Sequence, residues 1–544
     1  MKQLFFVSTL ISFFLISCSD GGSTGSGNGE TREAEKKISK RDYSINRENS
    51  YSDLFLDSIA MEKFITDKKL SDSISRRMRS FYNTRNFQFA WFSSDGLTEQ
   101  ALAFWNLHDY VTTYDDDTAL RDKSLQKRMD ALVAEESLSP SSSEKSYINT
   151  ELTLTHHFIQ YVLTNFEKGY VKRKEMERFI PFKKTDALVL ADSLLNKKHK
   201  DDKYFEDVNM RYSALKDHLG KYYNIAKAGG WPQVTTAKKT LKKGTSDPAI
   251  PLIKKRLQIT GEMPGQDTSQ IFNDTLESAV KIYQGRLGYT PDGIITATLI
   301  KDMNVTAMER LQQILVNMGR MRWMPTEPSG QLIVVNIPEF KLHVYEGKNQ
   351  VIEMNVVVGK EGHNTMMFSG DLNQVVFSPY WNVPPSIVRD EILPAMASNP
   401  SYLDGQNMEQ VGEEDGLPKI RQRPGGQNSL GRVKFLFPNS FNIYFHDTPA
   451  KSLFEKDKRA YSHGCIRLAE PEKMANYLLK DNAEWTPEKI SAAMNSGNEK
   501  FVRLKKAVPV IITYYTAWVD NNGQLNFRDD VYDHDKTIRR KMFP

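Results

Sequence analysis

The spacing of hydrophobic residues divides the chain into a helical first half and a strand-rich second half. Between residues 51 and 243, segments such as "SRRMRSFYNTRNFQFAWF" and "LTLTHHFIQYVLTNFEKGY" place apolar residues three and four positions apart. This period is typical of amphipathic helices. We therefore predict a helical scaffold domain over residues 51–243.

Residues 247–304 predict a compact unit of three short helices. Ile253 and Leu257 share one face of the first expected helix, and "PDG" supplies a turn ahead of the third. An amphipathic stretch over residues 305–324 then predicts a linking helix.

After the linking helix the pattern changes to strands. "LIVVNIPEFKLHVYEGKNQVIEMNVVVGK", "VKFLFP", "FNIYFH" and "VPVIITYYTAWVDNNGQLNF" alternate or are β-branched, and the last contains the hairpin signal Asn522-Gly523. Many short strands predict a sandwich or barrel-like domain over 325–535, followed by a tail at 536–544. A charged helical insertion at 386–427 is expected to cap one face of the sheet. The fold class is multidomain α+β.

The N-terminal residues predict export and lipidation. Met1–Ser17 has one Lys followed by an apolar run too short to span ~30 Å of bilayer, but suited to a signal peptide. It ends in "LISC", which resembles a bacterial lipobox and makes Cys18 the lipid-bearing residue. Residues 18–50 read as a flexible tether. We expect a membrane-anchored, periplasm-facing envelope lipoprotein; an ordinary secretory signal is the alternative.

Composition and charge limit the classes of binding partner that we expect. Hydrophobic residues make up 39% of the chain and aromatics 11%, which is typical of a globular protein. The 73 basic and 68 acidic residues nearly balance, and no basic stripe with interleaved aromatics is present, so nucleic acid is not an expected partner. The chain has 2 cysteines, and acylation of Cys18 leaves Cys465 as the one free thiol. A disulfide framework is thereby excluded.

Cys465 lies in "YSHGCIRL", two residues after His463. A free thiol has a pKa of ~8.5 and is a poor nucleophile until a base removes its proton. On an extended strand His463 and Cys465 would share one face. Gly464 would allow close approach of a substrate, and the amides of Gly464 and Cys465 are expected to face a developing oxyanion.

The segment around Cys465 resembles a known signature. His446, then 15 residues, then Ser-His-Gly-Cys followed by Ile-Arg is similar to the L,D-transpeptidase signature of bacterial cell-wall enzymes. "NVPPSIVRDEILP" and "PGGQNSLGRVKFLFPN" extend the resemblance to the large branch of that family, in which a helical scaffold, a wall-binding module and a capped catalytic domain share one chain. The unit at 247–304 resembles a three-helix peptidoglycan-binding module.

The resemblance implies an activity on peptidoglycan. Cys465 would cleave the amide between the diamino acid at position three of a donor stem and the terminal D-Ala, forming an acyl-enzyme. The amine of a second stem would then accept the acyl group and give a 3-3 cross-link. Alternatives are an L,D-carboxypeptidase, attachment of a protein to the wall, or a non-catalytic wall-binding scaffold. The family also implies inhibition by carbapenems and no metal or organic cofactor.

The resemblance also implies roles for single residues. His463 would accept the thiol proton, with the backbone carbonyl of Ser462 orienting its ring. Arg467 would meet a substrate carboxylate or carbonyl. The remaining expected substrate-binding residues are His446, Tyr444 and Asn428.

These residues admit other interpretations. Cys465 as a core thiol is the plain alternative. A zinc site built from His446, His463 and Cys465 lacks an evident fourth ligand. The residue order of a papain-like protease is absent. His156 and His157 have no ligand partners at suitable spacing and are read as helix-face residues.

Overall fold

The computed structural model describes residues 37–544, except 115–117, 136, 167–179, 197–209 and 325–329. The predicted signal peptide, Cys18 and most of the predicted tether lie outside the described residues. Among the helices of the described part, none combines the length and apolar character that a membrane span requires.

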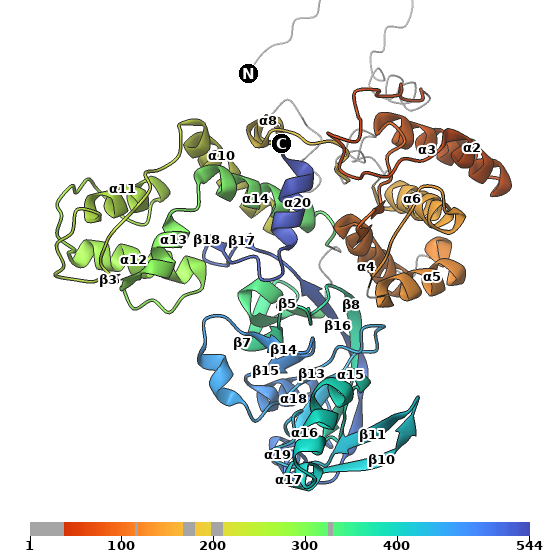
Figure 1. The fold of residues 1–544 in the computed structure, drawn as a ribbon, viewed down its shortest axis with the longest axis vertical. Coiled ribbons are helices and arrows are strands. Elements are labelled where there is room, and N and C mark those ends of the chain that lie inside the picture. The colour runs from red at the N-terminus through yellow and green to blue at the C-terminus, as the bar shows by residue number, and fades with distance from the viewer. Residues whose placement is uncertain (1–36, 115–117, 136, 167–179, 197–209, 325–329) are drawn as a thin grey trace, which may run out of the picture.

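A helical scaffold comes first along the chain; its first helices lie at the right of Figure 1 and its later ones nearer the centre. Its start lies earlier than predicted, because Ile45 is buried and the Asp42 amide donates to Asn83 O at 2.9 Å. The last part of the predicted tether at 18–50 therefore packs on the scaffold. The scaffold helices are α2 (Ser58–Asp67), α3 (Asp72–Thr84), α4 (Glu99–Tyr114), α5 (Lys123–Ala134), α6 (Lys145–Phe166), α8 (Ala187–Leu195) and α10 (Met210–Lys227).

Aromatic side chains fill the scaffold core. Trp91 stacks on Phe104 at 5.2 Å between ring centroids and meets Trp323 edge-on at 6.5 Å. The predicted linking helix is α14 (Ala307–Met321), whose apolar face joins the same core. The Thr306–Glu309 capping box fixes its start. This helix is thus part of the scaffold as well as a connection.

The three-helix unit has its own small core and is docked against later parts of the chain. Its helices are α11 (Ile250–Thr260), α12 (Asp274–Leu287) and α13 (Ala297–Met303), with a short β3–β4 pair (Thr240–Leu241, Ile295–Thr296). Arg286 Nε donates to Leu525 O at 2.6 Å, and the Thr290 amide donates to Asp457 Oδ1 at 3.2 Å. These contacts tie the unit to the hairpin at 517–527 and to the strand-rich half of the chain.

A nine-stranded sheet forms the second half, in the order β14-β7-β15-β13-β12-β8-β16-β5-β6. Because β6 also pairs with β7, the sheet closes on itself like a barrel, as the strand pattern predicted. Pairs β13–β15, β14–β7 and β16–β5 are parallel. The strands are β5 (Gln331–Asn336), β6 (Lys341–Glu346), β7 (Asn349–Gly359), β8 (Ser369–Phe377), β12 (Val433–Leu436), β13 (Phe445–His446), β14 (Ala460–Ser462), β15 (Ile466–Leu468) and β16 (Lys500–Thr513).

Alternation along β13 and β15 separates a core face from a polar face. Phe445 pairs with Ile466, and both are fully buried in the barrel core together with helices α18 (Pro471–Leu479) and α19 (Pro487–Met494). His446 pairs with Arg467, so these two side chains point to the opposite face.

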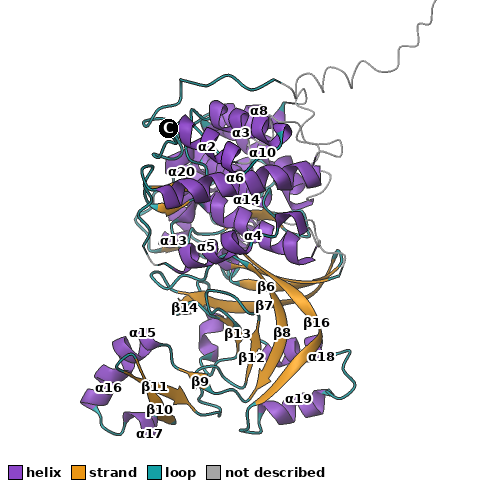
Figure 2. Cartoon of the chain, turned by 90° about the vertical axis from the view of Figure 1, so that its right-hand side faces the viewer, coloured by secondary structure: helices purple, strands orange, loops and turns teal. Residues whose placement is uncertain are grey.

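The insertion between β8 and β12 is a separate small lobe (Figure 2). Besides short helices it contains a β-hairpin, which the prediction of a purely helical cap did not include. Buried Val388, Met408 and Ile420 give the lobe its own core. Its elements are β9 (Trp381–Asn382), α15 (Pro385–Ile387), a π-helical turn η4 (Val388–Ile392), α16 (Leu393–Ser398), α17 (Tyr402–Gly405), β10 (Met408–Glu414) and β11 (Leu417–Gln422).

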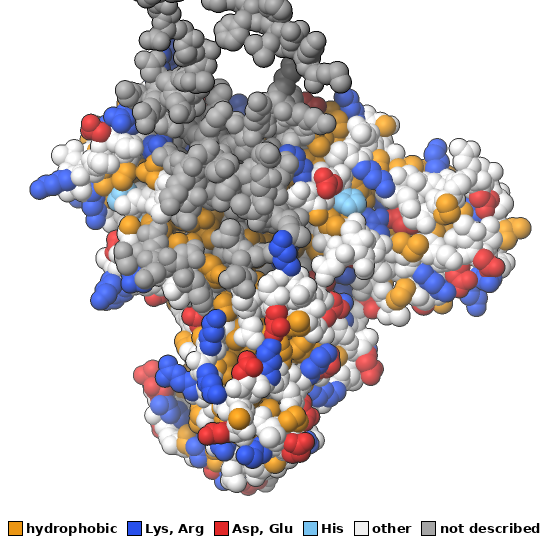
Figure 3. All heavy atoms as spheres, turned by 180° about the vertical axis from the view of Figure 1, so that it is seen from behind, with side chains coloured by type: hydrophobic (Ala, Val, Ile, Leu, Met, Phe, Trp, Pro, Cys, Tyr) orange, Lys and Arg blue, Asp and Glu red, His pale blue; other side chains and the backbone are white. Residues whose placement is uncertain are grey.

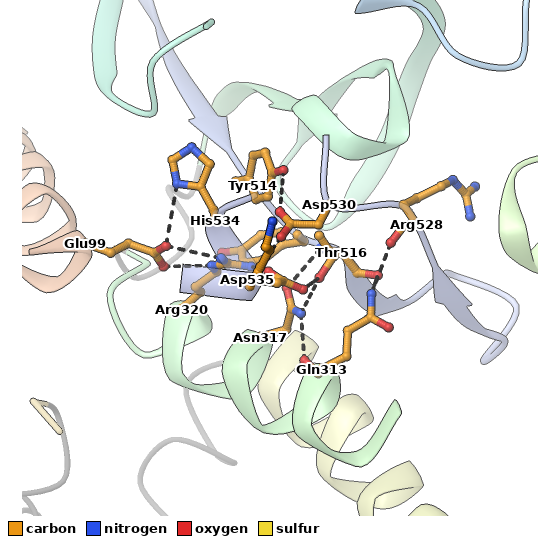
Figure 4. A network of polar contacts seen from close by, with 12 residues as sticks. Glu99, Gln313, Asn317, Arg320, Tyr514, Thr516, Arg528, Asp530, His534 and Asp535 are labelled. Atoms are coloured by element: carbon orange, nitrogen blue, oxygen red, sulfur yellow. Dashed lines mark hydrogen bonds and ion pairs between the residues drawn. The ribbon is translucent and has the colours of Figure 1, made fainter. Parts of the chain in front are cut away.

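The chain ends back in the helical scaffold. Hairpin β17–β18 (Ala517–Val519, Leu525–Phe527) turns at the predicted Asn522-Gly523 but lies outside the barrel sheet, against α10, α12 and α14. The predicted tail forms helix α20 (His534–Met542). Arg320 of α14 binds Glu99 at 2.7 Å and Asp535 at 2.5 Å, which joins scaffold and C-terminus through buried charges (Figure 4).

Surface charges of both signs are mixed. In the rear view of Figure 3, Lys and Arg side chains alternate with Asp and Glu over the visible face. Where that face is drawn in colour, the described residues form no continuous basic stripe of the kind that tracks a nucleic-acid backbone.

Candidate active site

Cys465 lies in a bend between β14 and β15, with His463 and Gly464 before it. Gly464 has φ +110°, a conformation that favours glycine. The expectation that His463 and Cys465 lie two apart on one extended strand is therefore corrected, because the chain turns between them. The glycine is needed for the bend that presents the thiol.

The bend is held by Ser462 and Thr365. The Ser462 hydroxyl donates to Cys465 O at 2.6 Å and accepts the Gly464 amide at 3.2 Å. Thr365 Oγ1 donates to Gly464 O at 2.7 Å. The Gly464 amide is thus occupied, contrary to the expected pair of oxyanion donors. Among the described residues the Cys465 amide has no acceptor, which leaves it available.

The Cys465 thiol rests against Tyr444. Cys465 is partly exposed, but its sulfur is largely surrounded by protein and lies 3.7 Å from Asn442 O. Burial raises the pKa of the thiol, while hydrogen bonds from the amide and hydroxyl of Tyr444 and the charge of Arg467 act in the opposite direction. The resting group is therefore a neutral thiol at neutral pH. Tyr444 thus contacts the Cys465 side chain directly.

His446 is buried on the strand next to β15. Its Nδ1 donates to the backbone carbonyl of Asp447 at 2.5 Å. Burial first, and then the charge of Arg467, lower its pKa to about 3. The ring is therefore neutral, with the proton on Nδ1 and a free lone pair on Nε2. Nε2 is thus the ring atom that can take up a proton, and burial opposes the charge that this creates.

His463 makes different contacts. Its Nε2 lies 3.0 Å from Glu391 Oε1 of the insertion, and its ring meets His363 edge-on at 4.9 Å. Burial lowers the pKa of His463, although Glu391 opposes that shift. The Ser462 carbonyl accepts the Lys360 amide at 2.9 Å, and among the described residues no hydrogen bond joins this carbonyl to the His463 ring, contrary to what the resemblance implies. The imidazole held by a backbone carbonyl is His446.

Arg467 continues a polar row across the sheet. Lys434, His446 and Arg467 are direct partners on β12, β13 and β15, so their side chains share a face. Arg467 Nε is buried and has no hydrogen-bond partner within the described residues. A buried guanidinium nitrogen without an acceptor is suited to a substrate oxygen.

Asn428 lies at the base of the insertion. It is buried, and its Nδ2 donates to Pro379 O at 3.2 Å and Arg423 O at 2.9 Å. These contacts connect the two ends of the insertion, at Pro379 and Arg423, where it leaves and rejoins the barrel. The structure thus gives Asn428 a supporting position, whereas the sequence suggested contact with substrate.

The structure adds residues that the sequence did not single out. Glu391 reaches His463 from the insertion, Asp447 holds His446, and Thr365 fixes the bend. Only Asp447 is adjacent in sequence to a predicted site residue, so only its contact had a local signal. In the part of the chain described here, no three His, Cys, Asp or Glu side chains are grouped to hold a metal ion.

Comparison with known proteins agrees with the sequence resemblance. Residues 330–512 match the family model described as YkuD, L,D-transpeptidase catalytic domain, and residues 76–219 match one described as Scaffold domain. A curated Haemophilus influenzae protein, named by inference as an L,D-transpeptidase, is 30% identical over 253 residues. That match covers 44% of this chain and 50% of the relative, so the chain spans about half the relative's length.

Solved structures of L,D-transpeptidases align only loosely. The Stackebrandtia nassauensis enzyme is 12% identical with a TM-score of 0.23, over 51% of this chain and 97% of that one. The Mycobacterium smegmatis enzyme is 14% identical with a TM-score of 0.18, over 34% and 58%. Overlays this weak do not themselves define the fold.

Proposed function

Residues 330–512 match the L,D-transpeptidase catalytic domain, and from this match we propose that the chain is an L,D-transpeptidase that cross-links peptidoglycan with Cys465 as nucleophile. One observation supports this most strongly. A partly exposed thiol stands beside a sheet face that carries a neutral imidazole and an unpartnered guanidinium nitrogen, from His446 and Arg467. Those are the groups that acyl transfer through a thioester requires.

In the first half-reaction the Cys465 sulfur attacks the carbonyl carbon of the amide between the third residue and D-Ala. The thiol proton moves to an imidazole as the C–S bond forms. We favour His446 for this step because its Nε2 lone pair is free, whereas the His463 ring is engaged with Glu391. The proton then passes to the nitrogen of D-Ala as the C–N bond breaks, leaving a thioester.

The tetrahedral intermediate carries a negative oxygen that needs donors. The Cys465 amide is free to serve, and one such donor is worth ~3–4 kcal/mol. Arg467 Nε, which is buried without an acceptor, is suited to a carbonyl or carboxylate of the stem. In the second half-reaction the side-chain amine of another stem attacks the thioester, the thiol leaves, and a 3-3 cross-link forms.

The test is mass spectrometry of muropeptides after incubation of the purified chain with tetrapeptide-rich sacculi. We expect dimers joined through their third residues. The Cys465→Ala variant should form none, whereas Val351→Ala, at a side chain 43% exposed on β7, should behave like the wild type. Release of D-Ala without dimers would indicate a carboxypeptidase. Dimers formed by Cys465→Ala would refute the proposed nucleophile.

The N-terminal pattern leads to a proposal about location. Met1–Ser17 and Cys18 have the features of a lipoprotein signal, so the enzyme would face the periplasm from a membrane anchor. Metabolic labelling with a fatty acid tests this. Cys18→Ser should abolish the label and release the protein from the membrane fraction; a labelled Cys18→Ser variant would contradict the proposal.

A further inference from the structure

Two oppositely charged residues lie at the bend that carries Cys465, and the proposed mechanism uses neither of them. Glu391 comes from the insertion, and its Oε1 lies 3.0 Å from His463 Nε2. Lys360 follows the end of β7; its backbone amide donates to Ser462 O at 2.9 Å, and its charge helps to lower the pKa of His463. A carboxylate and an ammonium group are therefore both close to the residues that directly precede the nucleophile.

The fold of the insertion presents Glu391 to the bend. Glu391 belongs to the π-helical turn η4, in which Val388 and Ile392 are buried in the small core of the insertion. The Glu391 side chain is 53% exposed, so its carboxylate is accessible to a solute as well as to His463. Short π-helical turns are rare and are frequent at functional sites. This turn thus places one carboxylate where the insertion meets the catalytic segment.

Neither charge is neutralised by a permanent partner. Burial lowers the pKa of His463 below its ordinary value, so the ring that contacts Glu391 is neutral at neutral pH. Among the described residues, no Lys or Arg side chain forms an ion pair with Glu391, and no Asp or Glu side chain forms one with Lys360. Lys360 is also exposed. Both groups are therefore free to bind charges of a ligand.

The position of these charges fits the side chain of the residue that Cys465 attacks. The Cα atoms of His463 and Cys465 are at most ~7.6 Å apart, because each Cα–Cα step is ~3.8 Å. In the proposed reaction the carbonyl carbon of the donor's third residue lies at the Cys465 sulfur. The side chain of a diamino acid is about as long as two extended residues, ~7 Å. Its charged end is therefore the part of the donor that can reach Glu391.

The charge of Glu391 suits the donor amine better than the acceptor amine. A carboxylate beside an amine stabilises the ammonium form and raises the pKa of the amine. The acceptor amine must lose its proton before it attacks the thioester, whereas the side-chain amine of the donor takes no part in the reaction. An ion pair with Glu391 therefore holds the donor without opposing the chemistry.

We propose that Glu391 and Lys360 bind the charged end of the side chain of the donor's third residue. The ligand class is a diamino acid whose side chain ends in both an ammonium and a carboxylate, as that of diaminopimelate does. Glu391 binds the ammonium and Lys360 binds the carboxylate. The inference rests on the proposed function, because that function places the donor carbonyl at Cys465.

The test measures binding of soluble tetrapeptides to the full chain carrying Cys465→Ala, by calorimetry. Acetylation of the side-chain amine of a diaminopimelate tetrapeptide should weaken binding about threefold to fivefold, as expected for one ion pair at a half-exposed site. Replacing diaminopimelate with lysine, which lacks the carboxylate, should have an effect of similar size. Glu391→Gln should remove the first difference and Lys360→Met the second. The matched controls are Glu409→Gln in the same insertion and Lys348→Met at the other end of β7, and both should keep the two differences.

Turnover by the chain with Cys465 intact separates donor from acceptor recognition. The kcat/KM for release of D-Ala should show the same two differences as binding. A difference that persists in its variant overturns the proposal. So does a Glu391→Gln variant that releases D-Ala like the wild type but forms a smaller share of dimers, because Glu391 would then bind the acceptor. Charge-dependent binding by Cys465→Ala, together with no release of D-Ala by the intact chain, would sustain the binding site and refute the proposed function.

Discussion

The Nδ1 atom of His446 lies 2.5 Å from the backbone carbonyl oxygen of Asp447, and this contact leaves Nε2 as the ring's one free acceptor. If Nε2 takes the thiol proton, His446→Gln should lower kcat by about 10²–10⁴, the usual contribution of a general base. His463→Gln should have a smaller effect, since its ring is held by Glu391. Muropeptide turnover measures both variants; a larger loss in His463→Gln would return the role of base to that residue.

Gly431 makes room for the carboxylate of Asp447. A Cβ at Gly431 would lie 2.4 Å from Asp447 Cγ, and its φ is +63°. Gly431→Ala should therefore destabilise the fold by more than the ~1–2 kcal/mol expected for left-handed strain alone, and it should also reduce activity by displacing Asp447. Gly347→Ala is the control, with φ +58° and no neighbour within 4 Å. Chemical denaturation compares them, and equal losses would mean that crowding of Asp447 is unimportant.

The thiol should titrate above its ordinary range. Burial raises the pKa of Cys465, so the protonated form dominates at neutral pH and the thiolate appears only as pH rises. The rate of alkylation by iodoacetamide should increase with pH to a midpoint above ~8.5, the value of a free thiol. Cys465→Ala corrects for any other site of labelling. A midpoint below the ordinary value would instead indicate a preformed thiolate–imidazolium pair.

Removing Arg320 should leave two buried carboxylates without their cationic partner. Arg320→Met leaves Glu99 and Asp535 without their cation in surroundings where each is nearly inaccessible. The expected loss in free energy of unfolding is about 3–5 kcal/mol. The matched control is Arg79→Met, which breaks the more exposed pair with Glu62 and should cost at most about 1 kcal/mol. Similar losses for the two variants would contradict a central role for the network in Figure 4.

The charge of Glu391 should have a measurable effect on the pKa of His463. The carboxylate raises the pKa of that ring against the larger effect of burial, which lowers it. Glu391→Gln removes the opposing charge, so the His463 pKa should fall further, and NMR titration of its ring protons measures the change. Glu409→Gln, on the hairpin of the same insertion, is the control and should leave the midpoint unchanged. An unchanged midpoint in Glu391→Gln would show that the insertion does not hold the ring.

Local patterns predicted much of this fold. The alternation of β-branched residues gave strands that close like a barrel, and Asn522-Gly523 marked a hairpin correctly. The pattern did not reveal that this hairpin packs on helices instead of extending the barrel. Period-two alternation reports that one face is buried, and it carries no information about which element covers that face.

The candidate site also has features that the sequence predicts and features that it does not. Cys465 and Gly464 were identified from adjacent residues, and the left-handed bend at Gly464 accounts for that spacing. The contacts of His463 were not foreseen, because its partner Glu391 lies in an insertion far away in sequence. The pattern also does not predict the hydrogen bond from the Gly464 amide to Ser462, because it favours a strand where the chain bends.

The helical core contains both the first helices of the chain and its last residues, because Ile538 and Phe543 pack in the same cluster as Leu56 and Phe64. A nascent chain therefore cannot complete that core until Ile538 and Phe543 have been synthesised. All strands of the barrel lie between α14 and hairpin β17–β18. The barrel can therefore fold before the later residues are synthesised. The order of assembly would thus run against the order of synthesis, with the middle of the polypeptide organised before its beginning.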